Sequence, residues 1–144
     1  MTVNTAVKLA LWLDDERPTP VPMPGYEWFR AYTAFEAIEI LRNRPIHYLS
    51  LDHDLGDETV TGTGNDVVRW IEEQVGTTDY EPPLIICVHS ANPPAHARML
   101  AGVESIARLR RQRQDAQVTA LLKEINAMVK TIVTYYGVDV NKRD

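Results

Sequence analysis

Three short apolar runs, each stopped at once by acidic or imidazole side chains, constrain the fold of this chain more than any other feature. The runs cover residues 8–13, 46–51 and 84–88, and each has the length and apolar character of a buried β-strand. The side chains that stop them are Asp14 with Asp15, Asp52 with His53 and Asp54, and His89 with Ser90 and Asn92. The pattern predicts strands that end in polar clusters.

The segments between these runs complete an alternation of strands and helices. Residues 27–32 alternate as a further strand. Thr33 and Glu36 then form the pattern of a capping box, which predicts a helix that ends before Pro45. Apolar residues at helical spacing between 67 and 75 predict a second helix, stopped by Gly76. The proline-rich stretch 17–25 and the polar stretch 56–64 are predicted to be loops.

This alternation predicts an α/β fold. We expect a doubly wound parallel sheet of about four strands, with helices on both faces and right-handed crossovers. In such sheets the ligand site lies beyond the carboxyl ends of the strands. If the strands are neighbours, all three polar clusters meet at one edge of the sheet.

The last third of the chain is predicted to be helical. Residues 99–109 and 121–133 each carry an apolar stripe at helical spacing, and residues 112–116 either separate two helices or lie within one long helix. The run 138–140 is too short to predict a fifth strand. We divide the chain into an α/β domain at 1–103 and a helical C-terminal extension at 104–144, packed on the domain or on a partner copy in a homo-oligomer.

Charge and cysteine content exclude several classes of protein. The formal net charge of −5 provides no general attraction for nucleic acid. A basic run on the late helix is either a solvated face or a local patch for a polyanion, and consists of Arg108, Arg110, Arg111 and Arg113. The single cysteine, Cys87, excludes an internal disulfide framework and favours a reducing, cytoplasmic location. No apolar run approaches the roughly 20 residues that span a bilayer, and we expect no signal peptide.

The acidic clusters point to a metal ion. Carboxylates that converge on one spot repel one another, and a hard divalent cation such as Mg²⁺ or Mn²⁺ would compensate them. Asp14, Asp15 and one of Asp52 or Asp54 would suffice. His53 and His89 each lie beside a carboxylate or hydroxyl, so they are either structural or suited to acid–base chemistry.

Several neighbouring side chains could hold a phosphate. Arg17 follows the first acid pair and could clamp a phosphate, and Arg98 is a second candidate. Asn92 lies at the start of a helix, where anions dock. Ser90 could be a nucleophile, but no G-x-S-x-G motif surrounds it, so we expect it to bind phosphate. Gly62 and Gly64 fit neither a P-loop nor a Rossmann pattern.

Together these motifs resemble the cyclic-phosphate-processing receiver-like family. The resemblance spans roughly residues 8–103 and rests on LWLDDERP around Asp14, LSLDHDLG around Asp52, TG with NDVVRW from Thr61, and HSANP from His89. It implies a receiver- or flavodoxin-like fold in which Asp14 and Asp15 bind metal. Either Asp52 or Asp54 matches the phosphoacceptor position of receivers, and Ser90 matches their hydroxyl residue. The receiver lysine at the end of strand five has no counterpart, which argues against phosphotransfer signalling.

The resemblance implies action on cyclic phosphates, such as a 2′,3′-cyclic nucleotide or an RNA end. The expected enzyme is a metal-assisted phosphoesterase. Its catalytic residues would be His53, His89 and Asp54, and its metal ligands Asp14, Asp15 and Asp52. Substrate would be bound by Arg17, Ser90, Asn92 and Arg98. The alternative is a catalytically inert receiver-like module that binds a phosphorylated ligand or a protein partner. A third hypothesis is a true receiver that is phosphorylated on an aspartate.

Overall fold

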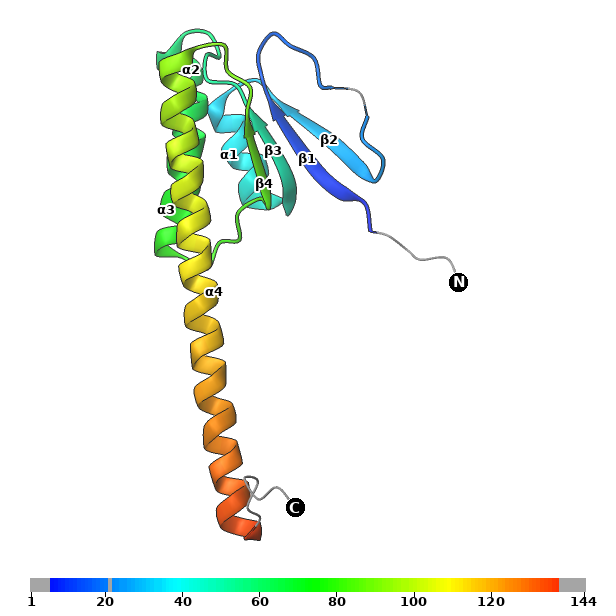
Figure 1. Ribbon diagram of the computed structural model, residues 1–144. Helices are drawn as coiled ribbons and strands as arrows, with labels where there is room; N and C mark the ends of the chain where they lie inside the picture. The colour runs from blue at the N-terminus through cyan, green and yellow to red at the C-terminus, as the bar shows by residue number, and fades with distance from the viewer. Residues whose placement is uncertain (1–5, 21, 138–144) are drawn as a thin grey trace. The chain divides into compact units, whose positions relative to one another are not determined.

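The computed structural model describes residues 6–20 and 22–137. The chain divides into two compact units, Met1–Leu109 and Arg110–Asp144. The first unit contains the whole sheet (Figure 1). The run 138–140, considered above as a strand, lies outside the described residues. Among those residues, no helix is both long and apolar enough to cross a membrane.

The sheet has four parallel strands in the order β2-β1-β3-β4. Their bounds are β1 Lys8–Leu13, β2 Tyr26–Ala31, β3 Ile46–Leu51 and β4 Ile85–Val88. The predicted parallel α/β sheet is therefore confirmed. The bounds of β1 and β3 agree with those predicted, whereas β2 begins and ends one residue earlier and β4 begins one residue later.

Within the described residues, four helices accompany the sheet: α1 Ala34–Asn43, α2 Glu58–Thr61, α3 Gly64–Thr77 and α4 Pro93–Tyr136. The single turn of α2 lies where only a loop was predicted, and Asp57 caps it by accepting a hydrogen bond from the backbone N–H of Thr59. The predicted stop at Gly76 is wrong, since α3 continues to Thr77. A single helix, α4, runs through residues 112–116.

The helix N-termini show which capping pattern the chain completes. Thr33 Oγ1 accepts a hydrogen bond from the backbone N–H of Glu36, but the Glu36 carboxylate accepts from Tyr32 rather than from Thr33. A complete capping box forms instead at Thr63 and Asp66, where α3 begins. That box fixes the start of α3 directly behind the polar end of β3.

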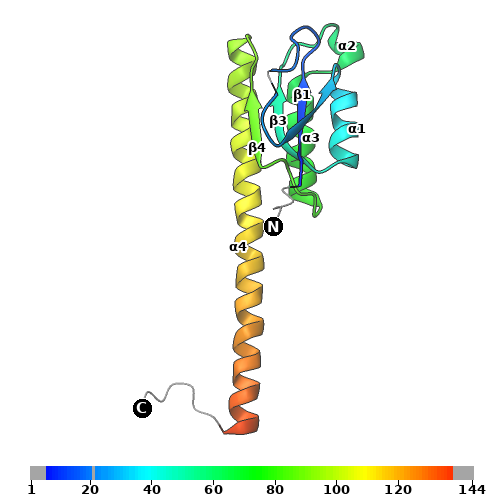
Figure 2. The ribbon, with the colours of Figure 1, turned by 90° about the vertical axis from the view of Figure 1, so that its right-hand side faces the viewer.

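The core lies on one face of the sheet. Leu11 and Leu13 of β1, with Leu49 and Leu51 of β3, are buried against residues of α1, α3 and the first part of α4. In Figure 1 these helices lie to the left of β1 and β2, and Figure 2 shows the first part of α4 beside β4. Helices on both faces, as predicted, are not found among the described residues. A right-handed crossover from β1 to β2 would place a helix on the other face, but the proline-rich segment 17–25 forms a loop.

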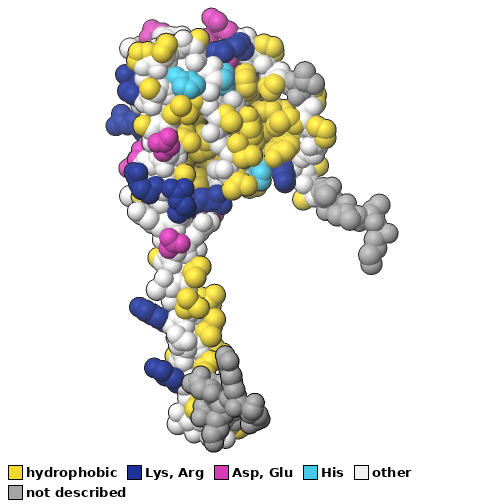
Figure 3. Space-filling view, viewed as in Figure 1, with side chains coloured by type: hydrophobic (Ala, Val, Ile, Leu, Met, Phe, Trp, Pro, Cys, Tyr) yellow, Lys and Arg dark blue, Asp and Glu magenta, His cyan; other side chains and the backbone are white. Residues whose placement is uncertain are grey.

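The other face of the sheet carries aromatic side chains. Trp12 and Trp28 meet edge to face with ring centroids 6.2 Å apart, and Trp28 meets Tyr48 in the same way at 5.6 Å. Tyr26 extends the cluster to Tyr48 at 6.4 Å. Hydrophobic side chains are visible over this part of the domain in Figure 3.

The strand order places a topological switch point between β1 and β3. From β1 the chain goes to β2 on one side, whereas β3 and β4 lie on the other side. In open parallel sheets, ligands bind at the carboxyl ends of the strands where the order reverses. The fold therefore predicts a ligand site formed by the residues that follow Leu13 and Leu51.

Candidate functional site

The three polar clusters lie side by side at the carboxyl edge of the sheet. The backbone N–H of Asp52 donates to Leu13 O at 2.9 Å, and that of His89 donates to Leu51 O at 2.9 Å. The backbone N–H of Asp14 donates to Ala31 O at 3.2 Å. The parallel ladder thus continues one residue past the strands and brings the first residue of each cluster into one row.

Three carboxylates converge in this row. One oxygen each from Asp14, Asp15 and Asp52 lies within 4.8 Å of the others. Asp14 and Asp52 are buried. Of the two acids that could match the receiver phosphoacceptor, Asp52 is the one that lies beside the acid pair.

Arg17 compensates part of this negative charge. Its Nε lies 3.0 Å from Asp14 Oδ2, and its Nη2 lies 3.3 Å from Asp52 Oδ2. A third nitrogen, Nη1, donates to the carbonyl oxygen of His89 at 3.0 Å. The guanidinium, predicted to clamp a phosphate, therefore holds two of the acids and the end of β4.

The two buried acids have opposite pKa shifts. Burial raises the pKa of Asp14, but it is outweighed by backbone N–H groups of Arg17 and Glu16, the bond to His89 and the charge of Arg17, so that the pKa is lowered. The two backbone groups donate to Asp14 Oδ1 at 2.7 and 2.8 Å. For Asp52, burial prevails over the backbone N–H of His53, and the charge of Asp14 adds to it, so the pKa is raised. A cation beside them would favour both ionised forms.

The His89 imidazole is held by contacts to both ring nitrogens and to its ring face. Its Nε2 lies 3.0 Å from Asp14 Oδ2, its Nδ1 lies 2.7 Å from Ser50 Oγ, and its ring stacks on Trp12 with centroids 3.9 Å apart. Burial, acting against the bond and charge of Asp14, lowers its pKa. Because both ring nitrogens are engaged, this arrangement suits a neutral imidazole that orients Asp14.

His53 forms a pair with Asp54. Its Nδ1 lies 2.7 Å from Asp54 Oδ1, and the imidazole is buried. The bond from His53, aided by Asn92 and opposed by slight burial, lowers the pKa of Asp54. The carboxylate therefore orients the imidazole through one ring nitrogen. Asp54 lines the cleft described below, whereas the buried His53 is not among its lining residues.

The loop after β4 is organised by its own polar side chains. Ser90 Oγ accepts from the backbone N–H of Asn92 at 3.1 Å, and Asn92 Oδ1 accepts from the backbone N–H of Ala95 at 3.2 Å, as expected of a helix cap. Asn92 Nδ2 also reaches Asp54 Oδ2 at 3.4 Å. Arg98 is exposed on α4 and is not among the residues that line the cleft described next.

A cleft of about 340 Å³ opens over the acids. Its lining residues are Asp15, Glu16, Arg17, Asp52, Asp54, Gly56 and Ala91. Glu16, Gly56 and Ala91 were not predicted as site residues. Trp12 and Ser50, which contact His89, were not predicted either. Their positions in the strands could have indicated them, since strand residues an even number of positions before Asp14 and Asp52 point to the same face.

Two glycines that suggested no phosphate loop have a packing role. A Cβ on Gly64 would lie 1.9 Å from the carbonyl oxygen of Asp52, so α3 approaches β3 more closely than any larger residue permits. Gly62 adopts φ +65°, and a Cβ there would lie 2.9 Å from that of Ala34. These contacts fix the backbone beneath the acidic cluster.

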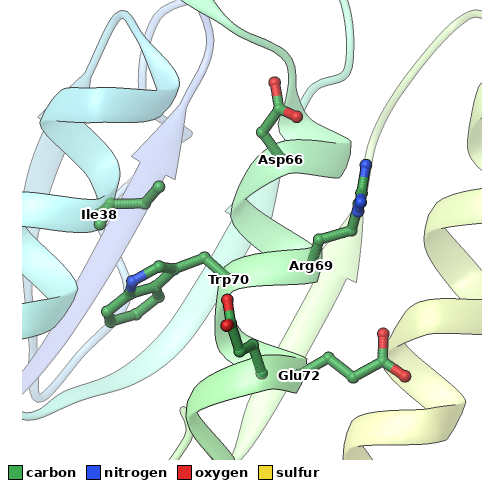
Figure 4. Close-up of a pocket in the computed structure, with 6 residues that line it drawn as sticks. Ile38, Asp66, Arg69, Trp70 and Glu72 are labelled. Carbon is green, nitrogen blue, oxygen red and sulfur yellow. The ribbon is translucent and has the colours of Figure 1, made fainter.

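A larger hollow, of about 700 Å³, lies between α1 and α3 (Figure 4). Trp70 points toward α1, whereas Glu72 points toward α4, where it accepts a hydrogen bond from Ser105 Oγ. The lining side chains do not converge on a common point, and no histidine is among them. The smaller cleft at the sheet edge is therefore the better candidate for chemistry.

Comparison with known protein families finds a match over the sheet-containing part of the chain. A family model described as the cyclic-phosphate processing receiver domain matches residues 9–105. The chain belongs to this family. The match runs from the second residue of β1 through β4, contains every residue of the acidic cluster and ends within α4. The family resemblance noted from the motifs is thus confirmed. A search of curated proteins finds no match.

Proposed function

We propose that the cleft binds a divalent cation and hydrolyses a cyclic phosphate ester, with a 2′,3′-cyclic nucleotide or an RNA end as substrate. The observation that carries this proposal is the convergence of Asp14, Asp15 and Asp52 beside the His53–Asp54 pair. Membership in a family described by cyclic-phosphate processing supports the substrate class.

The donor set fits a hard cation. Asp14, Asp15 and Asp52 offer only carboxylate oxygens, which Mg²⁺ and Mn²⁺ prefer to softer ligands. These three residues would hold the ion. When bound, such an ion polarises a phosphoryl oxygen and lowers the pKa of water. No thiol lies in the set, so a structural zinc site of the cysteine type does not fit.

His53 is the proposed proton carrier. The Asp54 carboxylate accepts from Nδ1–H, which places the lone pair of the neutral ring on Nε2. That nitrogen would take a proton from the water attacking phosphorus and return it to the leaving oxygen. Because the pKa of Asp54 is lowered, its charge persists over the range in which an imidazole titrates.

His89, Ser90, Asn92 and Arg17 are proposed to position the reacting groups. His89 orients Asp14 through the 3.0 Å contact and is itself held by Ser50 and Trp12. A phosphate in the cleft would meet the exposed side of the Arg17 guanidinium, since that side chain is 48% exposed. This division of labour departs from the expectation that both histidines move protons.

The test is hydrolysis of a 2′,3′-cyclic nucleotide by the full chain with Mg²⁺ or Mn²⁺, followed by separation of the monophosphate product. We expect His53→Ala to lower kcat about 10²- to 10⁴-fold, the usual contribution of a general acid–base. His47→Ala is the matched control, because His47 lies at the other end of β3 and packs against Tyr26. We expect the control to retain wild-type turnover.

The result also separates the enzyme from a binding module. Turnover that survives His53→Ala unchanged would contradict the proposed proton carrier. Saturable binding of the cyclic nucleotide in calorimetry, without any hydrolysis, would favour the alternative of an inert receiver-like module. If the chain neither bound nor hydrolysed the cyclic nucleotide, this substrate class would be rejected.

A further inference from the structure

The C-terminal part of α4 carries an exposed apolar stripe that the cleft does not use. The residues are Val118, Leu121, Leu122, Ile125, Met128, Val129, Ile132, Tyr135 and Tyr136, whose exposed fractions range from 39% to 79%. Within α4 the last buried residue is Ile106. A water-exposed helix of this length is marginal by itself, because helices in proteins owe most of their stability to packing.

The spacing of the stripe is that of a coiled-coil seam. Val118, Leu121, Ile125, Met128, Ile132 and Tyr135 follow one another at alternating steps of three and four residues. This is the a/d pattern of the heptad repeat, and it pairs with an identical stripe through knobs-into-holes packing. Leu122, Val129 and Tyr136 widen the seam by one position on the same side.

The opposite side of this segment is polar. Lys123 and Lys130 fall seven residues apart at the outermost heptad position. Figure 3 shows hydrophobic side chains along one side of this part of the helix and basic side chains along the other. Glu124 and Thr131 flank the seam, so two identical helices meet there without a concentration of like charge.

We infer that this stripe binds the same stripe of a second copy of the chain to form a dimer. The heptad spacing allows two copies of the stripe to pack against each other, and the exposed area of the stripe is large enough for a stable interface. Nine large side chains that each expose about half of their surface offer on the order of 800–900 Å² per chain, near the roughly 800 Å² per partner of a stable interface. A membrane surface fits less well, because interfacial helices are rich in Lys and Arg on the polar face, whereas residues 118–136 contain two basic residues, Lys123 and Lys130.

The experiment is light scattering of the full chain over a wide range of concentration. We expect twice the chain mass of 16.3 kDa. Ile125→Asp places a charge in the seam of both copies and should weaken the dimer by about 100-fold or more. Asn126→Asp, the next residue and outside the seam, is the matched control and should leave the dimer intact.

Other outcomes overturn the inference. They are a wild-type monomer at all concentrations, a monomer that binds lipid vesicles through this stripe, and a dimer that Ile125→Asp leaves unchanged. Circular dichroism of each variant checks that the α/β domain stays folded. Since no residue of the cleft is altered, the inference and the proposed hydrolysis succeed or fail separately.

Discussion

Replacing Gly64 by alanine tests whether the close approach of α3 to β3 holds the site together. Helix propensity alone predicts a gain, because alanine in a helix is more stable than glycine by about 0.5–1 kcal/mol. The geometry predicts the reverse. The new Cβ would lie 1.9 Å from the Asp52 carbonyl oxygen and 2.8 Å from Met99 Cε. Methionine can move, but the carbonyl belongs to the backbone of the sheet.

The magnitude follows from the separation that must be recovered. Cβ contacts shorter than 3.0 Å are essentially never seen, so α3 and the end of β3 must separate by about 1.1 Å. Overpacking of this kind costs roughly 1–3 kcal/mol or more. After the helix gain is subtracted, we expect the free energy of unfolding to fall by about 1–2 kcal/mol, which corresponds to a Tm lower by roughly 3–10 °C.

The assay is urea denaturation at constant protein concentration, followed by tryptophan fluorescence, since Trp12, Trp28 and Trp70 all lie in the first unit. Gly76→Ala is the control in the same helix, because its new Cβ meets only Leu109 Cδ1 at 3.9 Å. That variant should be more stable by about 0.5–1 kcal/mol. If Gly64→Ala were as stable as Gly76→Ala, the argument from close packing would be refuted.

Two further predictions concern charge at the cleft. The pKa values of His89 and Asp14 are lowered in the folded state, so each contributes stability above its unfolded value (6.5 and 3.8) that is lost as the pH falls through the folded value. His89→Phe should flatten the fall in unfolding free energy below pH 6.5, measured by urea denaturation, and an unchanged slope would contradict this. If Mn²⁺ binds the folded cluster as proposed, it should raise the Tm of the wild type, because a ligand that binds only the folded state stabilises that state. Asp15→Asn should raise the Mn²⁺ concentration needed for a given rise in Tm by about 10- to 100-fold. Asp79→Asn, outside the cluster, should leave that concentration unchanged.

The aromatic face of the sheet is not covered by a helix, although the alternation of strands and helices predicted helices on both faces. The order of strands and helices correctly predicted a parallel sheet, but the rule that helices cover both faces requires a helix between β1 and β2. The prolines in 17–25 exclude that helix, as the sequence itself indicated. The rule of helices on both faces conflicted with the prediction of a loop at residues 17–25. The loop forms, because proline lacks the donor and the backbone freedom that a helix needs.

By itself the sequence determined the strands, the polar residues that end them and the family motifs, because each depends on residues close together in the chain. Hydrophobic period and helix caps are local quantities. The partners of the polar residues were decided by tertiary structure. That Asp52 joins Asp14, and that Arg17 reaches Asp52 as well as Asp14, follows from strand order and register. Side chains far apart in the chain meet only after the whole sheet has formed, so local pattern does not specify which of them become neighbours.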